Sequence, residues 1–277
     1  MSKKNILFSI LILCSFNILF AETQKPARLV AYDLITVPGE KVIFRAKLEK
    51  NILFLRPDIK NEKIFFYINN KSIGESITNN EGFAFLPYTI NKPGIFELNV
   101  KLSTASGYIS NSISAKVFCS YKKRPAIIVD IDHTVADVSW FGYVTKPNKD
   151  VLPLKNAPEV LQKLSQKYDI VFVTKREEVF LWKTENWLKM NKFPDVPVFF
   201  WDLGDYPLSS AKYKTERIKK LKQIWDNISI GIGDRDTDTE AYLANNMKVI
   251  KIGKEEKVIP NVTYVSDWNE IARILLK

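Results

Sequence analysis

The stretch AIIVDIDHT, residues 126–134, decides the fold of the second half of this chain. Its four leading apolar residues are typical of a strand that is buried on both faces, as in a parallel sheet. Two carboxylates and a hydroxyl follow directly, at alternate positions. Side chains that follow a buried parallel strand lie at the carboxyl edge of the sheet, where α/β proteins bind their ligands. The stretch therefore predicts both a parallel sheet and a site at its edge.

Asp130 and Asp132 can divide the work of phosphate-ester cleavage between them. One carboxylate attacks phosphorus, and the other gives and then takes a proton. A carboxylate and a phosphate repel each other, so this chemistry needs a hard divalent cation between them. The motif alone leaves a second interpretation open, in which an aspartate after a strand merely starts a turn.

The sequence around this stretch alternates between buried strands and helices from Lys122 onward. We expect strands at 125–130, 169–174, 197–201, 228–233 and 247–252, and helices at 157–167, 177–190, 212–225 and 238–245. This alternation predicts an α/β fold with a parallel sheet covered on both faces.

The second of these strands ends at Thr174, just before an expected helix. A hydroxyl at that position can donate to a phosphate oxygen. The alternative is that Thr174 simply caps the helix.

A cation is also needed, and position selects it from the many lysines of 211–225. Lys214 lies on the same helical face as the apolar Ile218 and Leu221. A lysine on a buried face needs an anionic partner, because burying a lone charge is costly. Lys214 could instead extend to solvent from the first turn, and Lys212 is the second choice.

The fourth expected strand runs into Gly233-Asp234-Arg235-Asp236-Thr237-Asp238. Glycine permits a tight turn, and the acids supply the hard oxygen ligands that Mg²⁺ prefers. A calcium loop of the EF-hand type would need glycine at its sixth position and glutamate at its twelfth. Counted from Asp234, those positions hold Thr239 and Asn245, so the calcium interpretation fails.

The ordered set of a D-x-D-x-T, a strand-end Thr, a Lys and a G-D-x-x-x-D resembles the haloacid dehalogenase (HAD) superfamily over residues 122–277. Within it, the chain resembles the catalytic domain of lipins and related phosphatidate phosphatases, in Thr174-Lys175-Arg176 and in the following Thr184 and Trp187-Leu188. Two residues depart from that pattern: His133 replaces a small residue, and Asp234 replaces an asparagine. The role of His133 stays open.

The resemblance implies a Rossmann-like sheet and an Mg²⁺-dependent phosphatase that forms an aspartyl-phosphate. Asp130 would be the nucleophile and a metal ligand, and Asp132 the general acid and base, with its backbone carbonyl on the metal. Asp234 would complete the ligands, and Asp238 would bind the metal or orient the ligands. The phosphoryl oxygens would be held by Thr174 and Lys214.

The short segments between these motifs leave no room for a separate cap domain, so the site can accept a large or membrane-bound phosphoester. We therefore expect phosphatidate or another lipid phosphate as substrate, with Trp140, Phe141 and Tyr143 near it or packed under the flap. Soluble nucleotides or sugar phosphates are an alternative. A further alternative is a catalytically silent module that binds anionic lipid, although such a module would need neither Asp130 nor Asp132.

Residues 22–121 have the rhythm of short strands, expected at 28–37, 41–48, 63–68, 83–90, 94–102 and 112–119. Turn residues such as Pro38-Gly39 and Lys92-Pro93-Gly94 separate them, which predicts an antiparallel β-sandwich. The pattern resembles bacterial immunoglobulin-like modules. We interpret this half as a spacer, a packing partner or a docking module, and binding of carbohydrate or a partner stays open.

Residues 1–21 have the features of a secretory signal peptide. Lys3 and Lys4 precede an apolar run, and Ala21 offers a small residue for cleavage. Cys14 follows a leucine, whereas a lipid-modified cysteine normally follows a smaller residue. We therefore expect an exported protein, periplasmic or secreted, and less probably a lipoprotein. Only Cys119 would remain after cleavage, so no intramolecular disulfide could form.

The formal net charge is +10 at neutral pH, which favours acidic partners such as phosphorylated molecules or anionic lipid surfaces. The basic residues are scattered along the chain rather than gathered in one arm. We therefore expect no nucleic-acid partner.

Overall fold

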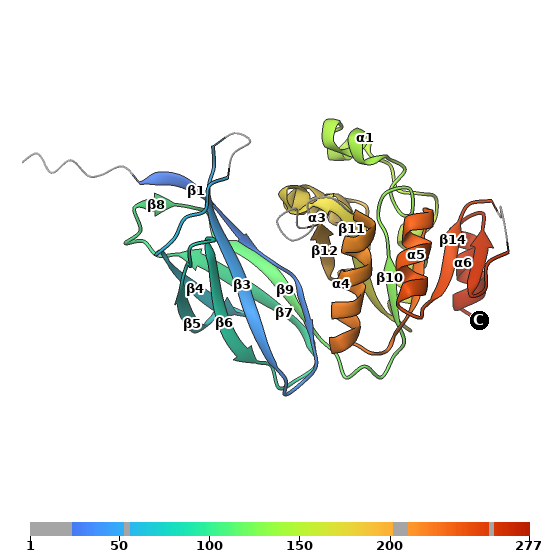
Figure 1. Cartoon of the computed structure of the whole chain (residues 1–277), viewed down its shortest axis with the longest axis horizontal. Helices are drawn as coiled ribbons and strands as arrows, with labels where there is room; N and C mark the ends of the chain where they lie inside the picture. The colour runs from blue at the N-terminus through green and yellow to red at the C-terminus, as the bar shows by residue number, and fades with distance from the viewer. Residues whose placement is uncertain (1–23, 53–55, 202–209, 255–257) are drawn as a thin grey trace, which may run out of the picture.

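The computed structural model of the protein describes residues 24–52, 56–201, 210–254 and 258–277. The expected signal peptide, residues 1–21, lies outside the described residues. No helix within those ranges has the length and apolar character needed to cross a membrane. Figure 1 shows an all-β half beside an α/β half, in chain order.

The first half is the expected immunoglobulin-like sandwich. One sheet has the strand order β6-β3-β1-β8, and the other has the order β2-β9-β7-β4-β5. The strands are β1 (Lys25–Ala31), β2 (Leu34–Thr36), β3 (Lys41–Lys50), β4 (Lys63–Ile68), β5 (Lys71–Ile77), β6 (Phe83–Thr89), β7 (Gly94–Leu102), β8 (Tyr108–Ile109) and β9 (Ile113–Cys119). Alternate residues of the facing strands fill the core between the sheets, among them Phe44, Phe66 and Leu98.

The sandwich differs from the expectation in its pairing and in its strand boundaries. An antiparallel sandwich was predicted, but β1 pairs with β8 and β2 pairs with β9 in parallel, and β8 itself was not expected. The stretch 28–37 is not one strand but β1 and β2, because the chain crosses between the sheets at Tyr32-Asp33. The Asp33 carboxylate holds this crossing by accepting the backbone N–H of Lys116 at 2.8 Å and of Val198 at 3.1 Å. Strand β5 was not expected, because its edge position requires little apolar sequence.

The second half is built on a six-stranded parallel sheet with the order β12-β11-β10-β13-β14-β15. Its strands are β10 (Ala126–Val129), β11 (Asp169–Glu177), β12 (Val198–Trp201), β13 (Ile228–Gly233), β14 (Lys248–Ile252) and β15 (Val262–Val265). The helices are α1 (Trp140–Thr145), α2 (Ala157–Leu164), α3 (Leu181–Met190), α4 (Ser210–Ile224), α5 (Asp236–Ala244) and α6 (Trp268–Leu275), with short 3-10 turns η1 (Asn148–Asp150) and η2 (Glu178–Phe180).

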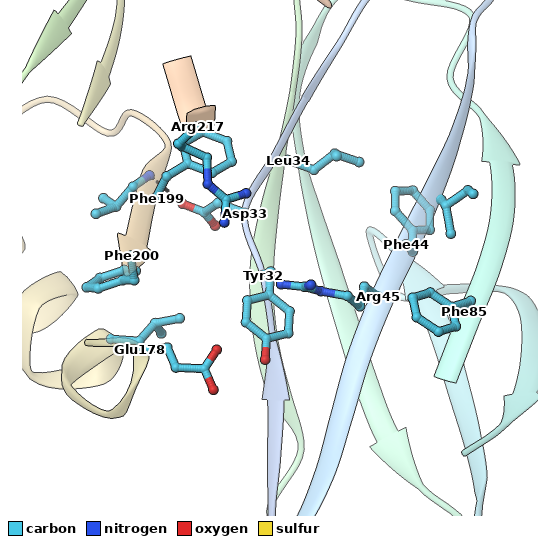
Figure 2. Close-up of a pocket in the computed structure, with 13 residues that line it drawn as sticks. Tyr32, Asp33, Leu34, Phe44, Arg45, Phe85, Glu178, Phe199, Phe200 and Arg217 are labelled. Carbon is cyan, nitrogen blue, oxygen red and sulfur yellow. Dashed lines mark hydrogen bonds between the residues drawn. The ribbon is translucent and has the colours of Figure 1, made fainter. Parts of the chain in front are cut away.

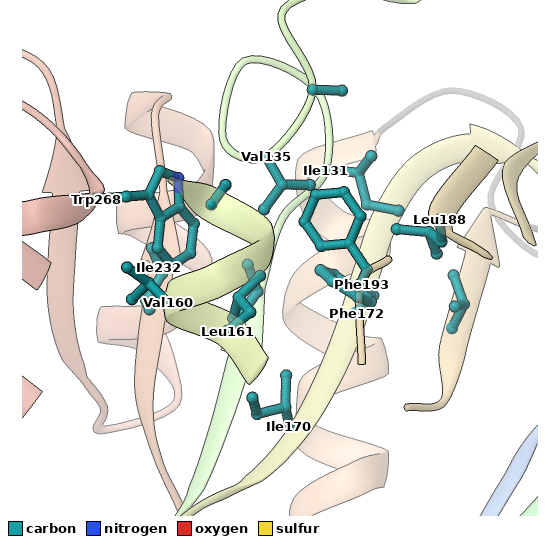
Figure 3. Packing of buried hydrophobic residues seen from close by; sticks show 14 of the residues in the cluster. Ile131, Val135, Val160, Leu161, Ile170, Phe172, Leu188, Phe193, Ile232 and Trp268 are labelled. Atoms are coloured by element: carbon teal, nitrogen blue, oxygen red, sulfur yellow. The ribbon is translucent and has the colours of Figure 1, made fainter. Parts of the chain in front are cut away.

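Successive residues of β10 point to opposite faces of this sheet and enter separate cores. Ile127 and Val129 pack with residues of α2, α3 and α6, including Leu161 and Trp268. Figure 3 shows this packing around Ile131, Phe172 and Ile232. Ala126 and Ile128 pack with α4 and α5 on the other face. Helices thus cover both faces, which confirms the expected α/β architecture with a covered parallel sheet.

The boundaries of the strand that begins at Asp169 and of the helix that follows it differ from the expectation. Strand β11 continues to Glu177 instead of ending at 174, and η2 precedes α3, so no single helix covers 177–190. The strand is longer because Glu177 pairs with Trp201 of β12 beyond an irregularity in the register. Strand β15 forms one edge of the sheet, and helix α6 packs on one of its faces. Neither element was expected from the sequence.

The two halves share apolar packing. Ile35, Val37 and Phe118 of the sandwich join the core that contains Leu221 and Trp225 of the α/β half. The Trp225 indole also donates to the backbone carbonyl of Thr36 at 2.9 Å.

A cavity of about 310 Å³ lies between the two halves, as Figure 2 shows. Tyr32, Arg45 and Phe85 line it from the sandwich, and Phe199 and Arg217 line it from the α/β half. The sandwich is therefore a packing partner of the α/β half.

Candidate active site

The parallel sheet brings the first and the last sequence motifs together. Asp130 follows β10, and Asp234 follows the neighbouring strand β13. The Asp130 N–H donates to the Ile232 carbonyl at 3.0 Å, which extends the pairing of the two strands to the site. Residues a hundred positions apart thus meet at the carboxyl edge of the sheet.

Three carboxylates meet at this edge. Asp130, Asp234 and Asp238 each offer an oxygen atom, and these atoms all lie within 4.8 Å of one another. The Thr134 hydroxyl lies 3.5 Å from Asp130 Oδ2 and 3.3 Å from Asp234 Oδ1, so it lies between two of them. Hard oxygen donors at this spacing fit a divalent cation such as Mg²⁺.

Gly233 is required by this close approach. A Cβ atom at position 233 would lie 2.7 Å from Asp238 Cβ and 2.9 Å from Asp238 Oδ2. Asp238 is held in turn by its place in the first turn of α5, where its Oδ2 accepts the Arg235 N–H at 3.3 Å. The glycine therefore lets a helix-borne carboxylate reach the end of β13.

Lys214 of α4 is the cation of the site. Its ammonium group is buried, with 1% of the side chain exposed, and donates to Asp238 Oδ1 at 2.6 Å and to Asp130 Oδ1. Lys214 therefore does not extend to solvent, and Lys212 is exposed instead. Burial alone would lower the pKa of Lys214, but the carboxylates of Asp130 and Asp238 outweigh it and keep the amine protonated.

Burial of the site raises the pKa of two of the carboxyl groups. Burial raises the pKa of Asp130 to about 7, and Lys214 opposes that rise while Asp238 adds to it. Burial also raises the pKa of Asp234, and Asp238 adds to that rise. Lys214 contacts two of the three carboxylates, Asp130 and Asp238, and Arg235 Nε lies 3.9 Å from the third, Asp234. A bound divalent cation would add to this neutralisation.

Asp132 lies apart from this cluster and pairs with Arg176, a residue to which the sequence assigned no role. Arg176 Nε lies 3.1 Å and 3.3 Å from the two carboxylate oxygens, and Nη2 lies 2.8 Å from Oδ1. Arg176 is fully buried on β11. An arginine just after a buried apolar run needs an acidic partner, and this was the signal that could have found it.

Thr174 is placed differently from the expectation that it ends a strand. It lies inside β11 and is fully buried, and its hydroxyl accepts the Arg176 N–H at 3.1 Å. Accepting that bond leaves the hydroxyl proton for another acceptor. Thr174 is nevertheless not among the described residues that line the cavity of the site.

That cavity has a volume of about 330 Å³ and combines expected and unexpected residues. Its expected members are acids and the lysine, and its unexpected members come from β11, the end of β12 and the turn before α5. The described lining residues are Asp130, Asp132, Lys175, Glu177, Trp201, Lys214, Arg235 and Asp238. Lys175 donates to the Thr237 hydroxyl at 3.0 Å.

The flap after the first motif divides its aromatic residues between two environments. Tyr143 is fully buried, whereas Phe141 is 70% exposed. His133 is exposed and has a φ of 58°, a left-handed conformation that favours glycine.

Comparisons with known proteins agree with this architecture. Residues 127–252 match the family model described as PITM 1-3, LNS2 domain. No curated protein matches the chain. The match spans the motifs from β10 to β14, which include every proposed site residue.

Solved structures with similar folds cover each half separately. A HAD-superfamily hydrolase, subfamily IA, from Geobacter sulfurreducens has 11% identity and a TM-score of 0.39, and the match covers 55% of this chain and 96% of that one. Fibronectin(III)-like modules of Clostridium thermocellum CbhA have 14% identity and a TM-score of 0.24, over 34% of this chain and 94% of theirs. The D00-D0 domain of intimin has 18% identity and a TM-score of 0.26, over 34% of this chain and 45% of that one.

These structural likenesses are too distant to add to what the sheet order itself shows. The chain combines an immunoglobulin-like sandwich with an α/β half, built on a parallel sheet, that is similar in sequence to the LNS2 domain.

Proposed function

We propose that the protein is an Mg²⁺-dependent phosphomonoester hydrolase that acts through an aspartyl-phosphate on Asp130. The observation that carries this proposal is the convergence of Asp130, Asp234 and Asp238 within 4.8 Å around the ammonium group of Lys214, with Asp132 on the same cavity. A structural ion pair would need neither a third carboxylate nor a cavity beside it.

The donor set fits Mg²⁺, because the carboxylate oxygens of Asp130, Asp234 and Asp238 are hard ligands that lie within 4.8 Å of one another. Asp130, Asp234 and Asp238 would hold the ion, together with the backbone carbonyl of Asp132. The ion would neutralise the phosphate and reduce its repulsion from the attacking carboxylate.

The reaction would proceed in two displacements. An Asp130 carboxylate oxygen attacks phosphorus while the bond from phosphorus to the ester oxygen breaks, and Asp132 protonates the departing oxygen. Asp132 then takes a proton from a water molecule that attacks the phosphorus of the aspartyl-phosphate. Inorganic phosphate leaves, and the Asp130 carboxylate is restored. Lys214 would hold a phosphoryl oxygen during both steps.

The substrate we propose is phosphatidate or another lipid phosphate, met at a membrane surface. The described chain places no separate cap domain over the cavity, and Phe141 of the flap and Trp182 at the start of α3 are 70% and 69% exposed. Exposed aromatic side chains suit the interface of a bilayer. The amino-terminal sequence supports an exported protein, and the scattered basic residues support no nucleic-acid partner.

The test is phosphate release with and without Mg²⁺ from phosphatidate vesicles, nucleotides and sugar phosphates, with Asp130→Asn as the control. We expect release from phosphatidate that needs Mg²⁺ and Asp130. Release from the soluble esters alone would exclude the lipid substrate but keep the chemistry. Binding to anionic vesicles without release from any ester would favour the catalytically silent module instead.

A further inference from the structure

We propose that Arg176 is the positioning residue for Asp132 and that it fixes the Asp132 carboxyl group, which gives its proton to the leaving group in the first step and takes one from water in the second. This inference rests on the proposed function. Arg176 contacts both carboxylate oxygens through Nε and one of them through Nη2, at distances from 2.8 to 3.3 Å. Two nitrogens on one edge of a planar guanidinium hold the plane of a carboxylate, which a single ammonium group cannot do.

Arg176 is itself fixed by its surroundings. Its Nη1 donates to the Thr184 hydroxyl at 3.2 Å, and that hydroxyl lies 3.0 Å from the Tyr143 hydroxyl. The guanidinium carbon lies 3.4 Å from the centre of the Tyr143 ring, and the side chain is fully buried. Tyr143 belongs to α1, the flap helix above the carboxyl end of β10 in Figure 1. The flap, β11 and α3 therefore all hold one arginine in place.

The Arg176–Asp132 pair differs from an ordinary structural ion pair because its aspartate lines the catalytic cavity. Arg124 pairs with the buried Asp169 at the opposite end of the same strand, β11, where the acid is remote from the catalytic cavity. Asp132 also has a buried carboxylate, but it lines the cavity beside Asp130. Arg124–Asp169 is also an arginine–aspartate pair, but 47% of the Arg124 side chain is exposed and it binds one carboxylate oxygen. Arg124→Lys therefore controls for the replacement of a guanidinium by an ammonium group away from the catalytic cavity.

The experiment compares Arg176→Lys with Arg124→Lys on two esters. Dioctanoyl phosphatidate has an alkyl leaving group that needs a proton, whereas p-nitrophenyl phosphate has an aryl leaving group that departs without one. For Arg176→Lys we expect kcat on the alkyl ester to fall about 100-fold, the order of a general-acid contribution, with a far smaller loss on the aryl ester. Arg124→Lys should change the two esters by the same factor.

Mg²⁺ affinity, measured by titration calorimetry, should be unchanged in Arg176→Lys because Arg176 does not contact the carboxylate cluster. If Arg176→Lys does not fold, Thr184→Val removes only the bond that orients Nη1, and we expect a smaller loss that is still selective for the alkyl ester. An equal loss on both esters, or no loss, in the variant that folds would overturn the inference. A wild type that releases phosphate from neither ester would instead overturn the proposed function.

Discussion

Asp130→Asn should stabilise the metal-free protein while it abolishes phosphate release. Ionisation of Asp130 costs the folded protein free energy, since burial raises its pKa to about 7 from an ordinary value of 3.8. The folded protein therefore disfavours the ionised form, and above pH 7 the wild type carries the full cost. Asparagine has nearly the same shape and can still accept a hydrogen bond from Lys214, but it never ionises.

The magnitude follows from the shift. Each unit of pKa corresponds to about 1.4 kcal/mol, so the full rise from 3.8 to about 7 sets an upper bound of about 4 kcal/mol. The attraction of Lys214 already lowers that pKa and is included in the bound. An amide replaces a carboxyl group imperfectly in a packed site, so we expect about 2 kcal/mol at pH 8.

The sign of the pH dependence is fixed by linkage. Between pH 4 and pH 7 the folded wild type binds more protons at Asp130 than the unfolded chain does, so its stability falls as the pH rises. The difference between variant and wild type should thus be near zero at pH 4, grow to pH 7 and then stay constant. Urea denaturation in EDTA at a series of pH values measures this directly.

In the presence of Mg²⁺ the wild type should become more stable than Asp130→Asn. A ligand present at 100 times its dissociation constant adds about 2.7 kcal/mol to the folded state that binds it, and Asp130→Asn loses much of that binding. Asp132→Asn is the matched control, because Asp132 pairs with the buried Arg176 and lies outside the carboxylate cluster. It should lose about 2 kcal/mol with or without metal. If Asp130→Asn is less stable than the wild type at pH 8 in EDTA, the cost assigned to burial of Asp130 is wrong.

Three further predictions concern other parts of the molecule. Burial raises the pKa of Glu185 to about 8, helped by Asp33, so ionisation costs the folded state stability as the pH rises from 4.5 to 8. Glu185→Gln should therefore exceed the wild type by about 1–2 kcal/mol in urea denaturation at pH 9 and match it at pH 4.5, after allowance for solvent near a partly buried group. Lys214→Met removes the cation between Asp130 and Asp238, and it should cost about 3 kcal/mol in urea denaturation and lower phosphate release at least 100-fold. His133→Gly relieves a left-handed backbone and should raise the unfolding free energy by about 1 kcal/mol, seen as a higher Tm; an unchanged or lower Tm would contradict that strain.

Much of the architecture was predictable because its determinants are local. An apolar run such as 126–129, followed directly by polar residues, favours a strand covered on both faces, and a helical stripe such as Ile218 and Leu221 indicates which lysine of α4 is buried. The carboxyl ends of parallel strands meet at one edge, so the order of motifs predicted that Asp130 and Asp234 would converge. The edge strand β5 was missed because partial exposure weakens its apolar pattern.

The sequence by itself determined the α/β fold, the sandwich before it and the residues of the carboxylate cluster, because each follows from a short pattern of burial and turn residues. Only the tertiary structure decided how Asp132 is held, since Arg176, Thr184 and Tyr143 come from three elements whose contact no spacing encodes. It also decided that the sandwich packs against Leu221 of α4 and against Trp225, the residue that follows this helix. Such contacts depend on how completed elements dock and bury charge, and that is a property of the packed chain.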